Sequence, residues 1–470
     1  MAPAAAGKET TAAMLRHGSK LVSYAYFFSA WGDRMWEFSG VLFVLELFSD
    51  TLLPSSLFGF IEVLVGILTS SRIGNYIDTH DRLKVMRESV VFQNIGVCLA
   101  SLVFYFVLNG EDLSLTQKWF YFSVVIPFSL LAKMSSTMNK ICIHKDWLVV
   151  LAGGDSEEQT RLNTSMRRID LITKIASPIL VGFISSFFSP RTAALFILIW
   201  SAISGVFEYN LNTYVFRNCK VLHNKLEKAK EKGEEGGRDA GGKKKAETFN
   251  LAQAFRAYAA HPVFMASFSY SMLYISLLSF GGIMISFLKL VGIPEIWLAI
   301  GRGFGAAVGV GASLVAPVLI KGMGLEAAGV FSIWLLALCL APSAIALLLM
   351  DYRSIEFAVS IFLSLGLSRF GLWAFDIVET QIMQVGVSEK ERGAINGTQE
   401  AFMNIGYLCG FVLTMIFSSA HQFAIPGSIS FLSVFLAAVL YTVYYFKGGQ
   451  AAVKRGGDGE TVNNAAKTAI

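Results

Sequence analysis

The chain has 470 residues, of which 54% are hydrophobic and only 16% are charged. A water-soluble protein of this size needs far more charge to cover its surface, so the composition excludes a water-soluble protein. The net charge of +5 lies mainly in loops between apolar segments, where it bears on membrane topology, and we expect no nucleic acid as a partner. The five cysteines follow no regular spacing, so we expect neither a disulfide framework nor a zinc site.

Apolar runs of about 20 residues recur along the chain, and each is long enough to cross a bilayer as a helix. We therefore expect an all-α integral membrane protein with about twelve spans, and no cleavable signal peptide. The predicted spans are 21–48, 54–77, 86–109, 119–143, 166–188 and 192–216 in the first half, and 262–290, 293–320, 325–350, 355–386, 392–419 and 424–447 in the second.

A charged, glycine-rich stretch at 217–250 divides these spans into two sets of six. It carries too little apolar surface to fold alone, which is typical of a solvated linker. The predicted order is an N-terminal segment at 1–20, a six-helix half at 21–216, the linker, a second six-helix half at 251–447 and a tail at 448–470. This order is the layout of the major facilitator fold, in which two halves face each other across a central path.

The positions of Lys and Arg predict the orientation in the membrane. If the N-terminus is cytosolic, the inner loops hold most basic residues and the whole linker, while the outer loops keep only Lys118, Arg191 and Arg353. Basic loops favour the cytosolic side, so we expect both termini there. We expect a monomer in the plasma membrane, with a vacuolar or other endomembrane location as the alternative.

Ionisable residues inside apolar spans are costly and usually functional. Six lie within or at the edge of such spans: Asp33, Arg34, Glu37, Asp170, Glu208 and Asp376. Asp33 and Glu37 stand four residues apart, so a helix puts both carboxylates on one face. The partner of this pair is an organic cation, a proton or a divalent metal ion. The alternative is that Arg34 simply neutralises Asp33 as a structural pair.

Polar residues on two other spans are candidates to complete an oxygen-rich site. They are Gln93 and Asn94 in the third span, and Ser201 and Glu208 in the sixth. Oxygen-only ligation also suits Ca²⁺, so these four residues are candidates for either metal or Ca²⁺ binding.

Charged and polar residues also gather at the predicted cytosolic ends of several spans. They are Asp78, Arg82, Asp146, Asn163, Arg167, Arg168, Asp170, Asp376 and Arg392. We predict that they form a gate at the cytosolic mouth; the alternative is that they are helix-end charges solvated in the membrane interface. The sequence contains no nucleophile–base constellation and no nucleotide motif, so we do not expect an enzyme.

Several short motifs resemble those of the ferroportin family and occur in the family's order. They include Trp31-Gly32-Asp33-Arg34-Met35-Trp36, Gln93-Asn94, Asp146-Trp147, Arg167-Arg168-Ile169-Asp170, Arg369-Phe370-Gly371-Leu372-Trp373 and Glu391-Arg392-Gly393-Ala394-Ile395-Asn396-Gly397. The resemblance covers about residues 20 to 420, the whole membrane domain. It implies a twelve-helix transporter of the major facilitator type with a broken seventh span. It also implies export of Fe²⁺, and often Co²⁺ or related ions such as Ni²⁺, from the cytosol.

The chain departs from the vertebrate pattern of that family at its metal ligands. An Asp-Cys pair in the broken span is replaced by Gly281 and Gly282, and a histidine in span 11 by Gly410. The histidine expected one turn after Asp33 is Glu37. The resemblance thus implies that the second-half metal site has lost its usual ligands and that hepcidin, which uses that cysteine, does not bind. The two glycines are still expected to break the helix.

We therefore interpret the chain as an exporter of a divalent metal, foremost Fe²⁺, that works by alternating access. Asp33 and Glu37 are the leading ligands of one site in the first half, and the metal is substrate and not cofactor. The carboxylates suggest proton counterflow, and the oxygen ligands suggest a regulatory role for Ca²⁺. The alternatives are a major facilitator for an organic cation and a membrane receptor that binds metal without transporting it.

Overall fold

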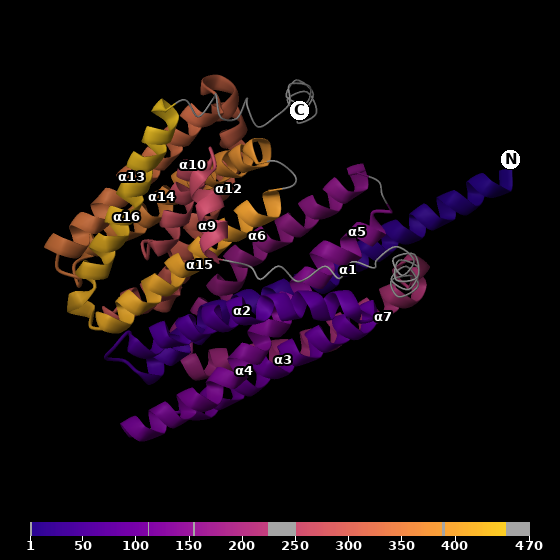
Figure 1. Cartoon of the computed structure of the whole chain (residues 1–470). Helices are drawn as coiled ribbons and strands as arrows, with labels where there is room; N and C mark the ends of the chain where they lie inside the picture. Colours follow the sequence, from indigo (N-terminus) through magenta and orange to yellow (C-terminus); the bar gives the residue numbers. More distant parts are fainter. Residues whose placement is uncertain (1, 111, 154–155, 224–250, 388–390, 448–470) are drawn as a thin grey trace. The chain divides into compact units, whose positions relative to one another are not determined.

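The computed structural model describes residues 2–110, 112–153, 156–223, 251–387 and 391–447. Every element in these ranges is helical, and no strand occurs among them (Figure 1). The all-α class predicted from the sequence is therefore confirmed. Most of the predicted linker, from 224 to 250, and the predicted tail at 448–470 lie outside the described residues.

The helices of the first half follow the predicted spans. In chain order they are α1 (Ala2–Leu47), α2 (Leu53–Thr79), α3 (Arg82–Val107), α4 (Leu115–Cys142), the π-helical turn η1 (Ile143–Trp147), α5 (Leu148–Leu151), α6 (Ser156–Phe187), α7 (Pro190–Asn218) and the 3₁₀ turn η2 (Lys220–Leu222). α1 begins far before the predicted residue 21. The segment ahead of the span is rich in alanine, the best helix former, and it continues the same helix.

The second half contains one interrupted span and five continuous ones. Its elements are α9 (Leu251–Ala260), α10 (Phe264–Met272), η3 (Leu273–Ile275), α11 (Gly282–Leu290), α12 (Glu295–Met323), α13 (Leu325–Leu349), α14 (Ile355–Gly386), α15 (Arg392–Ile416), η4 (Ala420–Gln422) and α16 (Ala424–Phe446). The predicted span at 262–290 corresponds to α10, η3 and α11.

Nine of the described helices are long and apolar enough to cross a membrane. α1 is not among them because Asp33, Arg34 and Glu37 interrupt its apolar surface. α15 also falls outside this group, and it carries amide and charged side chains such as Gln399 and Glu400. The seventh span is split into shorter pieces, of which Phe264–Ile275 is apolar. Together with the nine, these three account for the twelve predicted spans.

The chain packs as two compact units, and α2 is divided between them. Unit 1 comprises Met1–Phe48 and Leu64–Lys245, and unit 2 comprises Ser49–Val63 and Ala246–Ile470. The first part of α2 packs on α15, where the Ser56 hydroxyl donates to the Thr414 hydroxyl at 2.8 Å. The predicted halves at 21–216 and 251–447 assign this part of α2 to the first half, whereas its contacts belong to unit 2.

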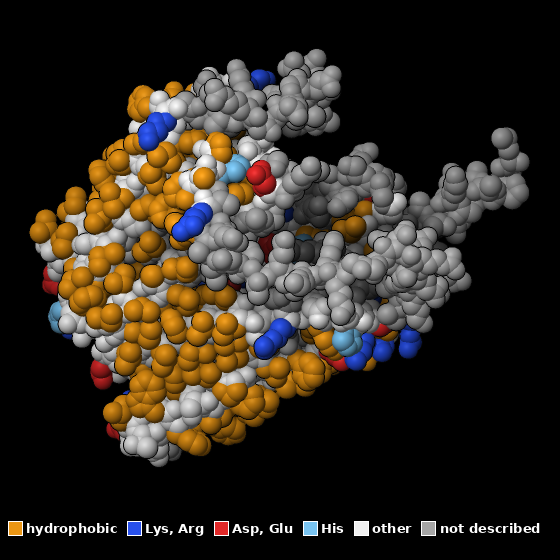
Figure 2. Space-filling model, viewed as in Figure 1, with side chains coloured by type: hydrophobic (Ala, Val, Ile, Leu, Met, Phe, Trp, Pro, Cys, Tyr) orange, Lys and Arg blue, Asp and Glu red, His pale blue; other side chains and the backbone are white. Residues whose placement is uncertain are grey.

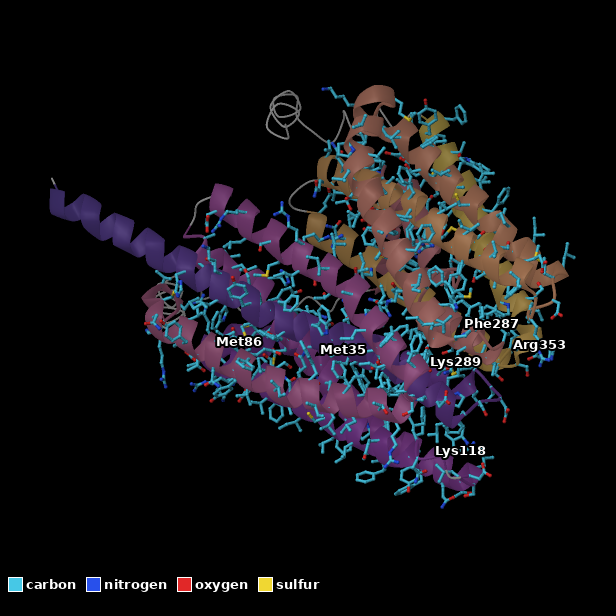
Figure 3. All side chains as sticks on the ribbon, turned by 180° about the vertical axis from the view of Figure 1, so that it is seen from behind. Met35, Met86, Lys118, Phe287, Lys289 and Arg353 are labelled. Carbon is cyan, nitrogen blue, oxygen red and sulfur yellow. The ribbon has the colours of Figure 1, made fainter. Side chains whose placement is uncertain are left out.

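Unit 1 is built around close contacts of α3 with α4 and α7, and of α1 with α6 and α7. Gly96 on α3 allows the approach of α4, because a Cβ there would lie 2.6 Å from the Phe128 carbonyl oxygen and 2.8 Å from the Ala132 nitrogen. Met35 on α1 and Met86 on α3 are fully buried in this unit (Figure 3). These contacts hold α1, α3 and α4 in register around Asp33.

Unit 2 packs α14 against α12 and α13, and α16 against α10 and α13. The ring of Phe287 stacks on Phe423 with centroids 3.9 Å apart (Figure 3). Large apolar side chains face outward on α13 and α16, for example Leu338, Leu349 and Leu432, and Figure 2 shows a broad apolar surface over these helices. Such a continuous apolar exterior is the lipid-facing surface of a membrane protein.

The seventh span is interrupted between Ile275 and Gly282, where the backbone is extended and loses its helical hydrogen bonds. Neighbouring side chains satisfy several of the freed groups. The Leu277 amide donates to the Ser430 hydroxyl at 2.9 Å, and the Arg369 guanidinium donates to the Leu278 carbonyl at 3.1 Å. Irregular backbone at membrane depth requires such partners, so α14 and α16 make the break tolerable.

We expect Gly371→Ala to destabilise unit 2. A Cβ at this position would lie 2.5 Å from the Leu336 nitrogen and 2.6 Å from the Ser332 oxygen, and both belong to rigid backbone. Overpacking of this kind costs about 1–3 kcal/mol. Gly311→Ala is the matched control because nothing lies within 4 Å of its added Cβ. Thermal unfolding in detergent should show a lower Tm for Gly371→Ala alone; equal Tm values for both variants would contradict the tight α13–α14 contact.

Candidate functional site

The Asp33 carboxylate lies where α1, α3 and α4 meet, and donors from two neighbouring helices bind it. Gln93 on α3 donates from Nε2 to Oδ1 at 2.8 Å. On α4, the Ser136 hydroxyl donates to Oδ2 at 2.5 Å, and Lys140 Nζ lies 2.8 Å from the same oxygen. The predicted partner Gln93 is therefore in contact with Asp33, whereas the sequence reasoning missed Ser136 and Lys140.

A second polar layer lies one helical turn earlier on α1, at Ser29. The Ser29 hydroxyl accepts from Asn139 Nδ2 at 2.9 Å and from Gln93 Nε2 at 3.3 Å. It also interacts with the carboxylate of Glu208 on α7, which is within electrostatic range of Asp33. Ser29 thus links the Asp33 site to the predicted residue Glu208.

Three buried oxygen atoms on α4 and α7 lack a hydrogen-bond partner among the described residues. They are Oε2 of Glu208, Oδ1 of Asn139 and Oδ1 of Asn212, whose residues are only 1%, 2% and 2% exposed. Asn212 follows Glu208 by one turn and shares its helix face. Buried acceptors without donors are costly, and a bound cation relieves that cost.

Glu37 engages a different partner from Asp33, although both lie on one face of α1. Its carboxylate pairs with Arg34 Nη1 at 2.6 Å, and its side chain is 45% exposed. Residues three and four positions apart are neighbours on a helix surface, so Arg34 and Asp33 both lie next to Glu37. Arg34 therefore neutralises Glu37, while Lys140 is the cation on Asp33.

The other two predicted oxygen donors have local partners. Asn94 donates to the Val90 carbonyl at 2.9 Å and lies against Gly205 on α7. Ser201 is buried on α7, where its carbonyl accepts from the Ser204 hydroxyl at 3.5 Å. Among the described residues, the side chains that contact the Asp33 carboxylate are Gln93, Ser136 and Lys140.

Two of the predicted gate residues, Arg82 and Asp146, form a bidentate ion pair in unit 1. Asp81 caps α3 by accepting from the Leu83 and Lys84 amides, which fixes Arg82 as the first helical residue. Arg82 Nε lies 2.9 Å from both Asp146 oxygens, and Nη1 donates to the Leu222 carbonyl at 3.1 Å. This fork ties α3 to η1 and η2 at one end of the unit.

Asp170 is held by a hydrogen bond from a tyrosine. It accepts a hydrogen bond from the Tyr26 hydroxyl at 2.8 Å, and the Tyr26 ring meets His144 edge-on at 5.0 Å. Burial lowers the pKa of His144, and the nearby Asp170 carboxylate opposes that shift in part. The imidazole is therefore neutral near pH 7, so the cluster adds no cation beside Asp170.

The grouping of the remaining predicted gate residues stays a prediction. Arg167 and Arg168 are exposed on α6. The side chains of Asp78, Asn163 and Arg392 lie outside the described residues.

Unit 2 contains a buried polar group that the sequence reasoning identified only in part. Asp376 on α14 accepts a hydrogen bond from the Tyr270 hydroxyl, which also contacts the Tyr274 hydroxyl at 3.0 Å. One turn later Glu379, 3% exposed, accepts from Gln399 on α15 at 2.6 Å. Glu379 was missed, although a carboxylate in an apolar span is itself a signal.

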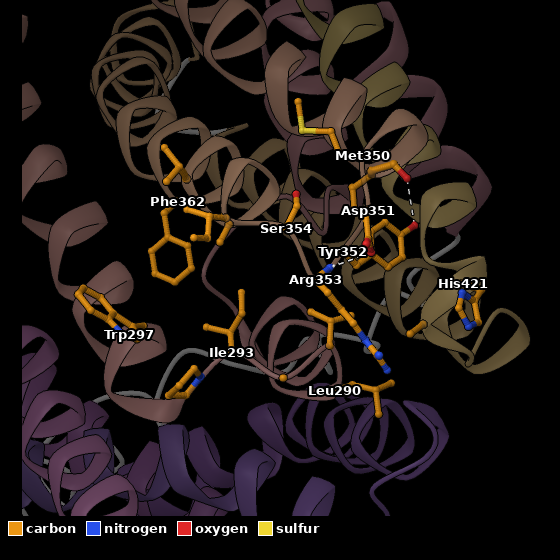
Figure 4. A pocket seen from close by; sticks show the side chains of 18 of the residues that line it. Leu290, Ile293, Trp297, Met350, Asp351, Tyr352, Arg353, Ser354, Phe362 and His421 are labelled. Carbon is orange, nitrogen blue, oxygen red and sulfur yellow. Dashed lines mark hydrogen bonds between the residues drawn. The ribbon is translucent and has the colours of Figure 1, made fainter.

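A cavity of about 1660 Å³ opens at one end of unit 2, away from these residues (Figure 4). It is bounded by the turns at 290–294, 350–354 and 419–421, and its lining includes Trp297, Arg353 and His421. None of the predicted site residues lines it.

The described residues contain no group of three or more His, Cys, Asp and Glu side chains that could hold a metal ion. The Asp33 region instead combines two carboxylates with amide and hydroxyl oxygens. Such a hard, oxygen-only set suits a divalent cation held loosely enough to be released.

These observations define a multi-pass membrane protein of the major facilitator type, with an interrupted seventh span and a polar site within its first unit. The family model described as Ferroportin1 (FPN1) matches residues 16–434. The chain therefore belongs to the ferroportin family, and it is a membrane transporter and not an enzyme.

Relatives in plants and bacteria resemble it along nearly their whole length. Solute carrier family 40 member 1 of Arabidopsis thaliana is 29% identical over 456 residues, covering 90% of this chain and 86% of the relative. A bacterial homologue of the iron transporter ferroportin, solved in an inward-facing state, shares the fold with a TM-score of 0.74 and 22% identity, over 91% of this chain and 98% of its own. An outward-facing structure of a bacterial homologue with soaked iron has a TM-score of 0.58 and 22% identity, and the match covers 91% of this chain and 99% of the homologue.

We expect Arg82→Ala to destabilise unit 1 strongly. The side chains of Arg82 and Asp146 are only 10% and 16% exposed, so removing the arginine takes the guanidinium away from a nearly buried carboxylate. That loss costs about 3 kcal/mol. Lys84→Ala is the matched control, because Lys84 is 54% exposed and 3.9 Å from Glu88, and it should cost less than about 1 kcal/mol. Denaturation midpoints of the purified variants test this expectation. Similar losses of stability in both variants would contradict a stabilising role for the Arg82–Asp146 ion pair.

Proposed function

We propose that this transporter exports a divalent transition metal, foremost Fe²⁺ and also Co²⁺ or Ni²⁺, from the cytosol by alternating access. The observation that carries the proposal is the Asp33 carboxylate, held within a transmembrane bundle by hydrogen bonds from the Gln93 amide and the Ser136 hydroxyl. A homologue's structure with soaked iron supports a metal as the substrate, and the inward- and outward-facing homologue structures support alternating access.

The metal binds at Asp33 in this proposal, with oxygen atoms of unit 1 as further ligands. Gln93 and Glu208 are the best supported of these, because Gln93 contacts Asp33 and Glu208 has an unpartnered buried oxygen nearby. Glu37 joins them when it leaves Arg34, which its exposed position permits. The same oxygen set supports Ca²⁺ as a regulator that competes for the site.

A gate on the cytosolic side completes the cycle. We propose that Asp146, Asp170, Asp376 and Arg392 close it, as the basic loops and the charged helix ends suggest. The Arg82–Asp146 fork and the Tyr26–Asp170 hydrogen bond support this idea for unit 1, because both join separate helices through predicted gate residues.

We propose that both termini lie in the cytosol, because most basic residues then lie in the inner loops. We also propose a monomer in the plasma membrane. Hepcidin is not expected to act, since glycine occupies positions 281 and 282.

We expect Asp33→Ala to abolish metal flux while leaving the protein folded. The substitution removes the carboxylate that Gln93 and Ser136 contact, and a site with one carboxylate fewer binds Fe²⁺ or Co²⁺ much more weakly. The measurement is Co²⁺ flux in liposomes containing purified protein. Asp50→Ala is the matched control, because Asp50 is an exposed aspartate just after α1. Full transport by Asp33→Ala at both low and saturating Co²⁺ would contradict the proposal.

We expect Co²⁺ binding to weaken as the pH falls from about 8 to about 5, because carboxylate ligands must lose their protons before they bind a metal. A site that exchanges protons for metal then drives proton counterflow. Calorimetry in two buffers of different ionisation enthalpy measures the protons released per metal ion. A flat affinity across this range, with equal heats in both buffers, would contradict proton coupling; thermal stability at each pH serves as the control for folding.

A further inference from the structure

The cation on Asp33 in this structure is part of the chain itself. Lys140 Nζ lies 2.8 Å from Asp33 Oδ2, and the same oxygen accepts from Ser136. An ammonium is a compact point charge with three donors and no acceptor, so it meets a carboxylate much as a small cation does. The lysine therefore occupies the carboxylate at which the proposed metal binds.

The position of Lys140 allows the pair to open and close. The lysine lies in the last turn of α4, and its side chain is 38% exposed, whereas that of Asp33 is 13% exposed. A partly exposed pair has a small net energy, so a metal ion with two charges is able to displace the ammonium. The flexible lysine side chain then moves toward solvent without a change in α4.

If Lys140 had a purely structural role, its contact with Asp33 would not be required. A lysine in the last turn of a helix interacts favourably with the helix dipole, and that role requires no partner on another helix. Lys140 instead reaches α1 and contacts the one carboxylate to which Gln93 and Ser136 also donate. Lys133, two turns earlier on α4, is exposed and offers a comparison within the same helix.

We propose that Lys140 is a tethered substitute for the metal, a proposal that rests on the proposed function at Asp33. With no metal bound, its ammonium neutralises Asp33, and the empty transporter changes state without an unpaired carboxylate in its centre. Metal binding displaces the lysine, and metal release lets it return. Lys140 thus sets the metal affinity and permits the empty carrier to reset.

The experiment compares Lys140→Met with wild type, with Lys140→Arg to restore the charge and Lys133→Met as the matched control. Calorimetry at one pH gives the Kd for Co²⁺, and liposomes give the rates of net Co²⁺ efflux and of Co²⁺–Co²⁺ exchange. Lys140→Met should bind Co²⁺ about tenfold more tightly, since it removes a competing charge. Its net efflux should fall about fivefold while exchange is kept, because only net efflux requires the empty carrier to reset.

The outcomes separate this inference from the proposed function. A wild-type protein that neither binds nor moves Co²⁺ overturns both. If the wild-type protein binds and moves Co²⁺ but Lys140→Met has the same Kd and the same ratio of efflux to exchange, only the proposed role of Lys140 is overturned. Lys133→Met should match wild type, and Lys140→Arg should restore most of the net efflux.

A measurement on the wild-type protein guards against a variant that fails to fold. Acetylation of lysines, followed by mass spectrometry, reports how accessible each ammonium group is. Saturating Co²⁺ should raise the labelling of Lys140 about threefold or more, because the ammonium loses its carboxylate partner. Labelling of Lys133 should stay constant. Unchanged labelling of Lys140 under conditions where Co²⁺ binds would overturn the displacement.

Discussion

A carboxylate in the middle of an apolar helix must be neutralised, and the organisation of unit 1 follows from how Asp33 meets that requirement. Gln93, Ser136 and Lys140 bring one amide, one hydroxyl and one ammonium to its two oxygens. These donors come from α3 and α4, so the one carboxylate links α1 to two neighbouring helices. The glycine contact between α3 and α4 makes this approach sterically feasible.

The same requirement explains why the site suits transport better than storage. Its polar atoms belong to amides, hydroxyls and carboxylates, and the described residues offer no cluster of histidine or cysteine that would hold a transition metal tightly. A transporter must release its substrate, so a modest site with a competing internal cation is an advantage. The buried oxygens of Glu208, Asn139 and Asn212 that lack a partner among the described residues are further candidate ligands in unit 1.

Much of this arrangement could be predicted from the sequence, and the failures have physical causes. The twelve spans, the interruption of the seventh and the contact of Gln93 with Asp33 follow from hydropathy, glycine and polar residues in apolar segments. The pairing of Lys140 with Asp33 could not be predicted, because composition does not reveal that the long lysine side chain reaches α1. Spacing alone also could not decide whether Arg34 pairs with Asp33 or Glu37. The division of α2 between the units depends on tertiary packing, to which hydropathy is blind.

The most direct test of the account is to locate Co²⁺ in the loaded wild-type protein by anomalous scattering and to identify its ligands by X-ray absorption at the cobalt edge. The account predicts one ion per chain beside Asp33, with a shell of oxygen atoms and no sulfur. An ion in unit 2 near Tyr270 or Cys409, or a shell that contains sulfur, would contradict it.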